Sequence, residues 1–158
     1  MLKYCVEKWF ENRGKLEQVI RQDENLNKCD YKYLLQLVIE NILNFGADDN
    51  YQFDETKITM VDDGDYSGTQ LFLIPRKTYE PGAGDYLLTY VEYGSCAICD
   101  MLEKVQCHLD KEVSDSQLAD FMLICKDFIC NMIKPYNVGW REDEIFDEHT
   151  DRWENSRM

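Results

Sequence analysis

Residues 57–93, KITMVDDGDYSGTQLFLIPRKTYEPGAGDYLLTYVEY, decide the fold of this chain. Three runs within them, KITMVD, TQLFLIP and DYLLTYVEY, are short and rich in β-branched and aromatic residues, which favour strands. The segments between the runs, DGDYSG and KTYEPGAG, have the composition of turns. The stretch therefore predicts a three-stranded antiparallel meander.

Two helices are predicted before the meander. Apolar residues recur at helical spacing over residues 2–21, interrupted only by Gly14. A second helix is predicted to begin after its cap, Asp30, to place Leu34 and Phe45 on its inner face, and to stop at Gly46. Both helices are amphipathic, so each should bury one side against the sheet or against the other helix.

Two further helices are predicted after the meander. A short one is expected from Ile98 to about Cys107, with Ser95 as its cap. A longer one begins at a capping box formed by Ser114 and Gln117, and Pro135 is expected to end it.

The order of these elements predicts an α+β fold with two N-terminal helices, a three-stranded antiparallel meander, two C-terminal helices and an acidic tail. We expect one domain over residues 1–134 and an acidic, aromatic-containing tail over 135–158. A doubly wound nucleotide-binding fold is excluded, because it needs alternating strands and helices. No window is apolar enough to span a membrane and the N-terminal residues carry charges, so we expect a cytosolic protein that binds no membrane.

The net charge of −14 is unevenly distributed over the 158 residues. Residues 46–68 hold seven acidic side chains and one lysine, and the tail holds seven acidic side chains and three arginines. Such a chain repels phosphate backbones, so direct binding to nucleic acid is disfavoured and a basic protein surface is the expected partner. The alternative is that the acidity only keeps the protein in solution.

The turn YGSCAICD at residues 93–100 has three interpretations. Cys96 and Cys99 could form a redox pair, because a helix N-terminus lowers a thiol pKa, or they could be half of a zinc site. A zinc site needs a second pair of ligands, and Cys107 would lie about 12 Å along the helix axis from Cys99, which is too far. The third interpretation, a buried structural corner, is favoured, and we expect no cofactor.

The stretch from DDGDYSG to the turn YGSCAICD, followed by the helix LADFMLICKDFICNMI, resembles a group of uncharacterised small proteins of bacteriophages and prophages. These proteins share a Y-G-S-C-x-x-C-D turn, and the similarity covers about residues 60–134. Ala97 and Ile98 depart from the pattern, because smaller residues are expected there. The resemblance implies a phage or mobile-element origin, and hence a bacterial host cytoplasm, but no reaction.

The resulting hypothesis is a non-enzymatic, acidic interaction protein that inhibits a host defence or nucleic-acid-handling protein. Its partner would be a host protein with a basic channel, such as a CRISPR effector or another nuclease, and the acidic surface would occupy that channel in the manner of an anti-CRISPR or a DNA mimic. The predicted contact residues are acidic side chains in the middle of the chain and in the tail, with three aromatic anchors in the tail. They are Asp48, Asp49, Asp54, Glu55, Asp62, Asp63, Asp65, Trp140, Glu142, Asp143, Glu144, Phe146, Asp147, Glu148 and Trp153.

Two alternatives stay open. One is a thiol-redox or zinc-binding module centred on Cys96 and Cys99. The other is a structural homodimer whose acidity is incidental. The aromatic residues of the tail could also pack on the chain's own domain.

Overall fold

The computed structural model describes residues 2–64, 67–94 and 100–134, together with the backbone of 144–147 and 152–155. It contains an antiparallel sheet of three strands in the order β1-β2-β3. These strands are β1 (Thr59–Asp62), β2 (Gly68–Pro75) and β3 (Tyr86–Tyr93), so the predicted meander is confirmed.

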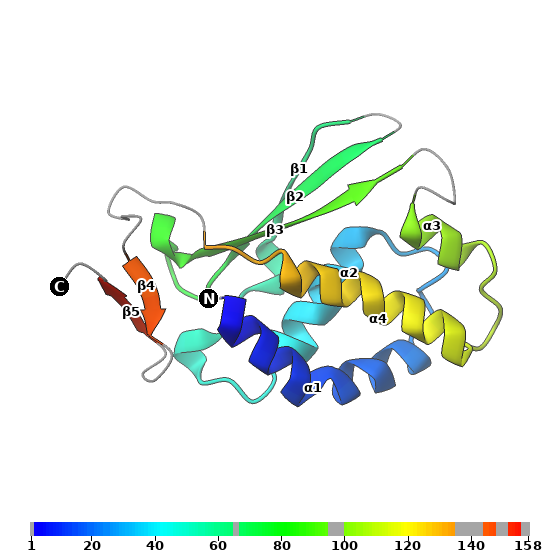
Figure 1. Cartoon of the computed structure of the whole chain (residues 1–158), viewed down its shortest axis with the longest axis horizontal. Helices are drawn as coiled ribbons and strands as arrows, with labels where there is room; N and C mark the ends of the chain where they lie inside the picture. The colour runs from blue at the N-terminus through cyan, green and yellow to red at the C-terminus, as the bar shows by residue number, and fades with distance from the viewer. Residues whose placement is uncertain (1, 65–66, 95–99, 135–143, 148–151, 156–158) are drawn as a thin grey trace.

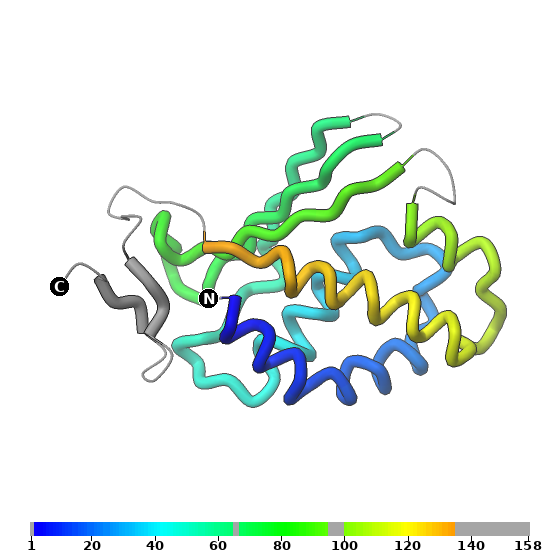
Figure 2. The backbone as a smooth tube through the Cα atoms, viewed as in Figure 1, coloured from blue at the N-terminus to red at the C-terminus, as the bar shows by residue number. Residues whose placement is uncertain are grey.

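Four α-helices pack with this sheet and confirm the α+β class: α1 (Leu2–Gln22), α2 (Tyr31–Val38), α3 (Met101–Gln106) and α4 (Asp115–Cys130). Figure 1 shows α1, α2 and α4 on one side of the sheet. The first and last helices, α1 and α4, lie side by side although almost the whole described chain separates them (Figure 2). The helices therefore cover one face of β2 and β3, whereas β1 is exposed along its length.

The second helix changes its geometry before it ends. Asp30 caps α2 as predicted, because its Oδ1 accepts a hydrogen bond of 2.8 Å from the Tyr33 N–H. After Val38 the chain continues as the π-helical turn η1 (Ile39–Leu43), and the predicted stop at Gly46 has a φ of 75°. A positive φ is a conformation that glycine adopts without a steric penalty.

A buried asparagine of α1 binds the end of this helix. The Asn12 side-chain amide donates to the Ile42 carbonyl at 2.8 Å and to the Phe45 carbonyl at 3.1 Å. The predicted inner position of Phe45 is wrong: its side chain is 49% exposed, and the Lys15 ammonium lies 5.5 Å from the centre of its ring. Because the π-helical turn adds a residue to the helical repeat, the side chains after it are rotated away from the predicted face.

The C-terminal helices are both shorter than predicted. Helix α3 begins at Met101, where the Asp100 side chain accepts from the Glu103 N–H, and not at Ile98 with Ser95 as cap. Residues 95–99 lie outside the described residues. The capping box of Ser114 and Gln117 is confirmed at the start of α4.

Helix α4 ends at Cys130, five residues before the predicted stop. The chain leaves the helix because Ile133 forms an antiparallel bridge with Leu88 of β3, in which each residue donates to the other at 2.8 Å. The Asn131 side chain also donates to the Tyr90 carbonyl at 3.2 Å. Pairing with β3 thus overrides the helical pattern.

Phe128 of α4 lies at the centre of the core. Its ring meets the ring of Phe72 edge to face at 5.8 Å and the ring of Tyr31 at 6.5 Å. Beside it, the fully buried Thr89 of β3 donates from its hydroxyl to the Phe128 carbonyl at 2.7 Å. This bond joins the sheet to the last turn of α4, where the carbonyl has no partner within the helix.

The hydroxyl of Tyr31 holds the start of α3. It donates to the Asp100 carboxylate at 2.5 Å and accepts from the Leu102 N–H at 3.3 Å. Burial and the hydrogen bond to Asp100 raise the pKa of Tyr31 above its ordinary value. The second helix and the third are therefore connected through one side chain.

The tail contains a pair of strands that the sequence pattern did not predict. The backbone of β4 (Glu144–Asp147) pairs with that of β5 (Arg152–Asn155), with Phe146 opposite Trp153. Within the described residues, no helix is both long enough and apolar enough to cross a membrane.

We expect Thr89→Val to destabilise the protein by about 1–3 kcal/mol, because it leaves the Phe128 carbonyl without its buried donor. The measurement is unfolding in urea. Thr59→Val is the matched control, since Thr59 is exposed on the edge strand β1, and its effect should stay within about 0.5 kcal/mol. Equal effects of the two substitutions would contradict the importance of the Thr89 bond.

Candidate binding surface

The sheet has one face that the helices leave open. Phe72, Ile74, Leu87 and Thr89 are buried, so the residues that alternate with them point to the opposite face. That face carries an apolar group of side chains, which we call the open face: Val61, Leu71, Leu73, Leu88, Tyr90 and Ile133.

Several side chains of the open face are accessible to solvent. Val61 is 51% exposed, Leu71 is 37% exposed and Ile133 is 52% exposed. The register places Val61, Leu71 and Tyr90 side by side across the three strands. Contiguous exposed apolar side chains of this kind are typical of interaction surfaces.

The sheet that carries the open face contains no basic residue. Between Lys57 and Lys104 the only basic residues are Arg76 and Lys77, which lie in the loop after β2. Glu92 is exposed at the end of β3, on the same side of the strand as Leu88 and Tyr90. The open face therefore combines apolar side chains with negative charge.

Asp62 and Asp63, two of the predicted contact residues, hold the turn between β1 and β2. The Asp62 carboxylate accepts from the Tyr93 hydroxyl at 2.6 Å, from the Gly64 N–H at 3.0 Å and from the Gln70 side chain at 3.1 Å. Asp63 accepts from the Thr69 N–H at 2.7 Å. These carboxylates are exposed but already bonded, so they stabilise the turn whatever else they bind.

The glycine of this turn has no room for a side chain. A Cβ at Gly64 would overlap the carbonyl oxygen of Ser67. The hydrogen bonds to the Asp62 and Asp63 carboxylates, together with the close approach of Gly64 to Ser67, determine the shape of the turn. Asp65, the third predicted acidic residue here, lies outside the described residues.

The other predicted acidic residues of the middle segment lie near the opposite end of β2. The Asp54 N–H donates to the Pro75 carbonyl, five residues along β2 from Gln70, the partner of Asp62. Five residues of a strand span about 17 Å. The described acidic residues of 46–68 therefore do not form one patch.

Among the described acidic residues of this segment, only Asp48 and Asp49 are exposed and make no side-chain hydrogen bond or ion pair with the described part of the chain. The Asp54 carboxylate caps the short helix Glu55–Lys57 by accepting from the Thr56 N–H, and a second hydrogen bond, from the Thr56 hydroxyl, lowers the pKa of Asp54. Glu55 is partly buried, and its Oε2 has no hydrogen-bond partner among the described residues. Of the described acidic residues in this segment, Asp48 and Asp49 are thus the ones that are free to meet a partner.

The predicted contact residues of the tail have no described side chains. Trp140, Glu142, Asp143 and Glu148 lie outside the described residues. Glu144, Phe146, Asp147 and Trp153 lie in the paired backbone of β4 and β5.

Cys96 and Cys99 also lie outside the described residues. Of the other cysteines, Cys5 and Cys125 are buried, and burial raises the pKa of the Cys5 thiol to about 12. Cys107 is exposed. Over the described ranges, no three His, Cys, Asp or Glu side chains are grouped so that they could hold a metal ion.

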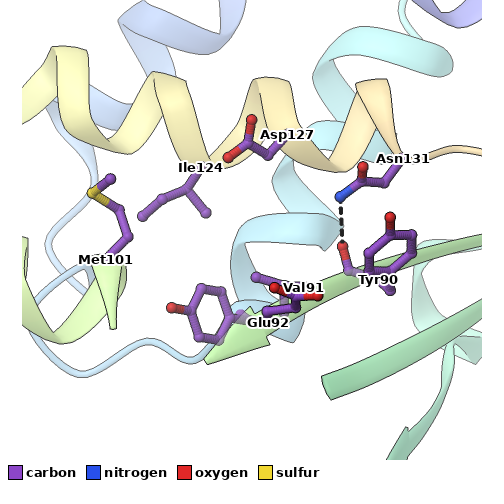
Figure 3. A pocket seen from close by; sticks show the side chains of 8 residues that line it. Tyr90, Val91, Glu92, Met101, Ile124, Asp127 and Asn131 are labelled. Carbon is purple, nitrogen blue, oxygen red and sulfur yellow. Dashed lines mark hydrogen bonds between the residues drawn. The ribbon is translucent and has the colours of Figure 1, made fainter. Parts of the chain in front are cut away.

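A cavity of about 410 Å³ lies beside the open face, between the edge of β3 and helix α4. We call it the edge groove (Figure 3). Val91, Met101 and Ile124 form its apolar part, and Glu92, Asp127 and Asn131 supply polar groups.

Two carboxylates border the edge groove, and none of the residues that line it is basic. Partial burial raises the pKa of Asp127, although Lys126 next to it acts in the opposite direction. The groove can therefore hold an apolar group together with a cation.

Sequence reasoning missed the edge groove. Glu92 and Asp127 are 35 positions apart, and each alone has the pattern of a solvated side chain on a strand or a helix. The packing of α4 against β3, which the Thr89–Phe128 hydrogen bond and the Ile133–Leu88 pair hold, brings them to one groove. No short-range signal in the sequence indicates that pairing.

The chain matches no protein-family model, no curated protein and no solved structure.

We expect the Asp62 carboxyl to titrate below the usual aspartate pKa of about 3.9, because the hydrogen bond from the Tyr93 hydroxyl favours the charged form. A lowered pKa means that the bond stabilises the fold above the usual aspartate range and that this stabilisation is lost as the pH falls below it. Tyr93→Phe should raise the pKa, and Tyr86→Phe on the same strand should not. The measurement is an NMR titration of the carboxyl carbon, and an unchanged value in Tyr93→Phe would contradict the assignment.

Proposed function

We propose that this protein is a non-enzymatic, phage-encoded interaction protein that binds and inhibits a host defence or nucleic-acid-handling protein. The observation that carries the proposal is the absence of basic residues from the whole sheet, whose open face is apolar and bordered by Glu92. A basic partner surface complements such a face in charge, while the exposed Val61 and Leu71 supply area to be buried.

The net charge of −14 supports the same kind of partner. A large negative charge accelerates encounter with basic surfaces and suppresses encounter with nucleic acid. Host proteins that handle nucleic acid, including CRISPR effectors and restriction enzymes, have basic channels. Occupation of such a channel would exclude its nucleic acid, which is the proposed mode of inhibition.

The first experiment is capture of partners from a nuclease-treated bacterial lysate, followed by purification of the captured protein. Binding to the purified partner should weaken steeply with added salt, because charges at an exposed interface are screened over about 10 Å at 0.1 M ionic strength. Nucleic acid should compete for the partner. Binding that is indifferent to salt and to nucleic acid would contradict the proposal.

Charge reversal at Asp48 and Asp49 distinguishes the effect of local charge on association from the effect of net charge. The double substitution Asp48→Lys and Asp49→Lys should slow association by about 3- to 10-fold, with a smaller effect on dissociation, because steering acts on the encounter. The control, Asp110→Lys with Glu112→Lys, makes the same change in net charge on exposed residues between α3 and α4. Association rates measured by surface plasmon resonance should differ between the two. Equal rates would show that only net charge matters.

Leu71→Glu tests the open face directly. We expect it to weaken partner binding by about tenfold or more, because it places a charge in the middle of the apolar patch. Phe10→Glu is the matched control: Phe10 is 61% exposed on α1, away from the open face. Dissociation constants from calorimetry give the comparison. If Phe10→Glu has the larger effect, the binding face lies on the N-terminal helix and not on the sheet.

A further inference from the structure

We propose that the free edge of β3 beside α4 receives an extended, basic segment of a protein partner, which adds to the sheet as its next strand. The inference rests on the proposed function in that it requires a protein partner. It adds to that proposal which part of the partner binds, an extended segment, and where it binds, the edge of β3.

The direction of the backbone groups of β3 follows from its bridge to Ile133. Leu88 uses both its N–H and its carbonyl to pair with Ile133, so these groups point away from β2. Backbone groups alternate along a strand, so those of Tyr90 and Glu92 also point away from β2. Within the described chain no strand pairs with this edge beyond Leu88.

The chain's own segment stops short of these groups. Asn131 lies opposite Tyr90, but it is the C-terminal cap of α4. It therefore binds the Tyr90 carbonyl with its side chain and not with its backbone. Farther along β3, α4 stands back from the edge and leaves the edge groove between them (Figure 3). The Tyr90 N–H and both backbone groups of Glu92 therefore face a space that an additional strand could fill.

The side chains around the groove indicate the chemistry of the added segment. Glu92 lies on the open side of β3 and Asp127 on the side of α4, and no basic residue lines the groove. Met101 and Ile124 are placed to contact an apolar side chain. A segment with alternating basic and apolar residues complements both the carboxylates and the apolar side chains of the groove, whichever of its faces turns toward α4.

A second copy of this chain is a poorer occupant. Each copy carries a net charge of −14, and pairing two β3 edges would bring two copies of Glu92 close together. Like charges at an interface oppose association. Dimer formation through this edge is therefore an outcome that would overturn the proposal.

The test uses defined peptides and the full chain. The probe is the capped hexapeptide Lys-Val-Lys-Val-Lys-Val, followed by amide NMR of the protein. Binding should shift the amide signals of Tyr90 and Glu92 and slow their hydrogen exchange. The same peptide with every backbone nitrogen methylated should not bind, because it has no donors for pairing. The peptide Glu-Val-Glu-Val-Glu-Val should not bind either, because its charge matches that of the groove.

Variants of the protein separate the backbone from the charge. Glu92→Gln and Asp127→Asn remove one charge each and should weaken binding of the Lys-Val peptide by about 3- to 10-fold. Glu92→Pro also removes the N–H on the edge of β3, so it should weaken peptide binding more than Glu92→Gln does. The sheet should stay intact, because this N–H does not pair with β2. Glu112→Gln, away from the groove, is the control, and the amide spectrum of each variant reports whether it is folded.

Three results would overturn the inference: no shift at Tyr90 and Glu92 with millimolar Lys-Val peptide, equal binding of the methylated or acidic peptide, or concentration-dependent dimerisation that Glu92→Pro abolishes. Failure of the proposed function is a different result, namely that no host protein is captured while the peptide still binds at this edge. Conversely, a captured partner that binds Glu92→Pro as well as the parent protein would leave the proposed function standing without strand addition.

Discussion

The buried hydrogen bond from the Thr89 hydroxyl to the Phe128 carbonyl sets the position of α4 against β3. It acts beside the edge-to-face contact of Phe128 with Phe72, so a polar bond and an apolar contact hold the same turn of the helix. Because this turn is held, the next residues leave the helix at a defined point and Ile133 reaches Leu88. The edge groove is the space between β3 and α4 next to the point where the chain leaves the helix and pairs with β3.

The division of the sheet into two faces has a physical consequence for binding. One face is covered by helices, and the other keeps exposed apolar side chains on strands that carry acidic residues and no basic ones. Apolar area supplies the free energy of association, while charge mainly selects the partner and speeds the encounter. The negative charge of these strands favours a basic partner, which agrees with the role that we propose.

The fold was predictable where local signals decide it. Runs rich in β-branched and aromatic residues, with turn compositions between them, identified the three strands, and side-chain caps identified the starts of α2 and α4 at Asp30 and Ser114. The predictions failed where a distant contact competes with a local pattern. Pairing with Leu88 ends α4 before Pro135, the hydroxyl of Tyr31 binds Asp100 at the start of α3, and the π-helical turn rotates Phe45 outward.

The candidate site was predictable only in its charge. The acidic composition indicated a basic partner, but it could not distinguish Asp62, which holds a turn, from Asp48, which makes no side-chain bond within the described chain. Nor could it place Glu92 and Asp127 on one groove, because that depends on how α4 packs against β3. Composition determines the kind of surface, and topology determines where it lies.

Hydrogen–deuterium exchange on the protein, alone and in complex with a partner captured from a bacterial host, tests the central claim most directly. We expect the partner to slow exchange at Tyr90 and Glu92, on the edge of β3, and to leave exchange in α1 unchanged. Protection confined to α1, or to the loop that contains Asp48 and Asp49, with β3 unchanged, would contradict it.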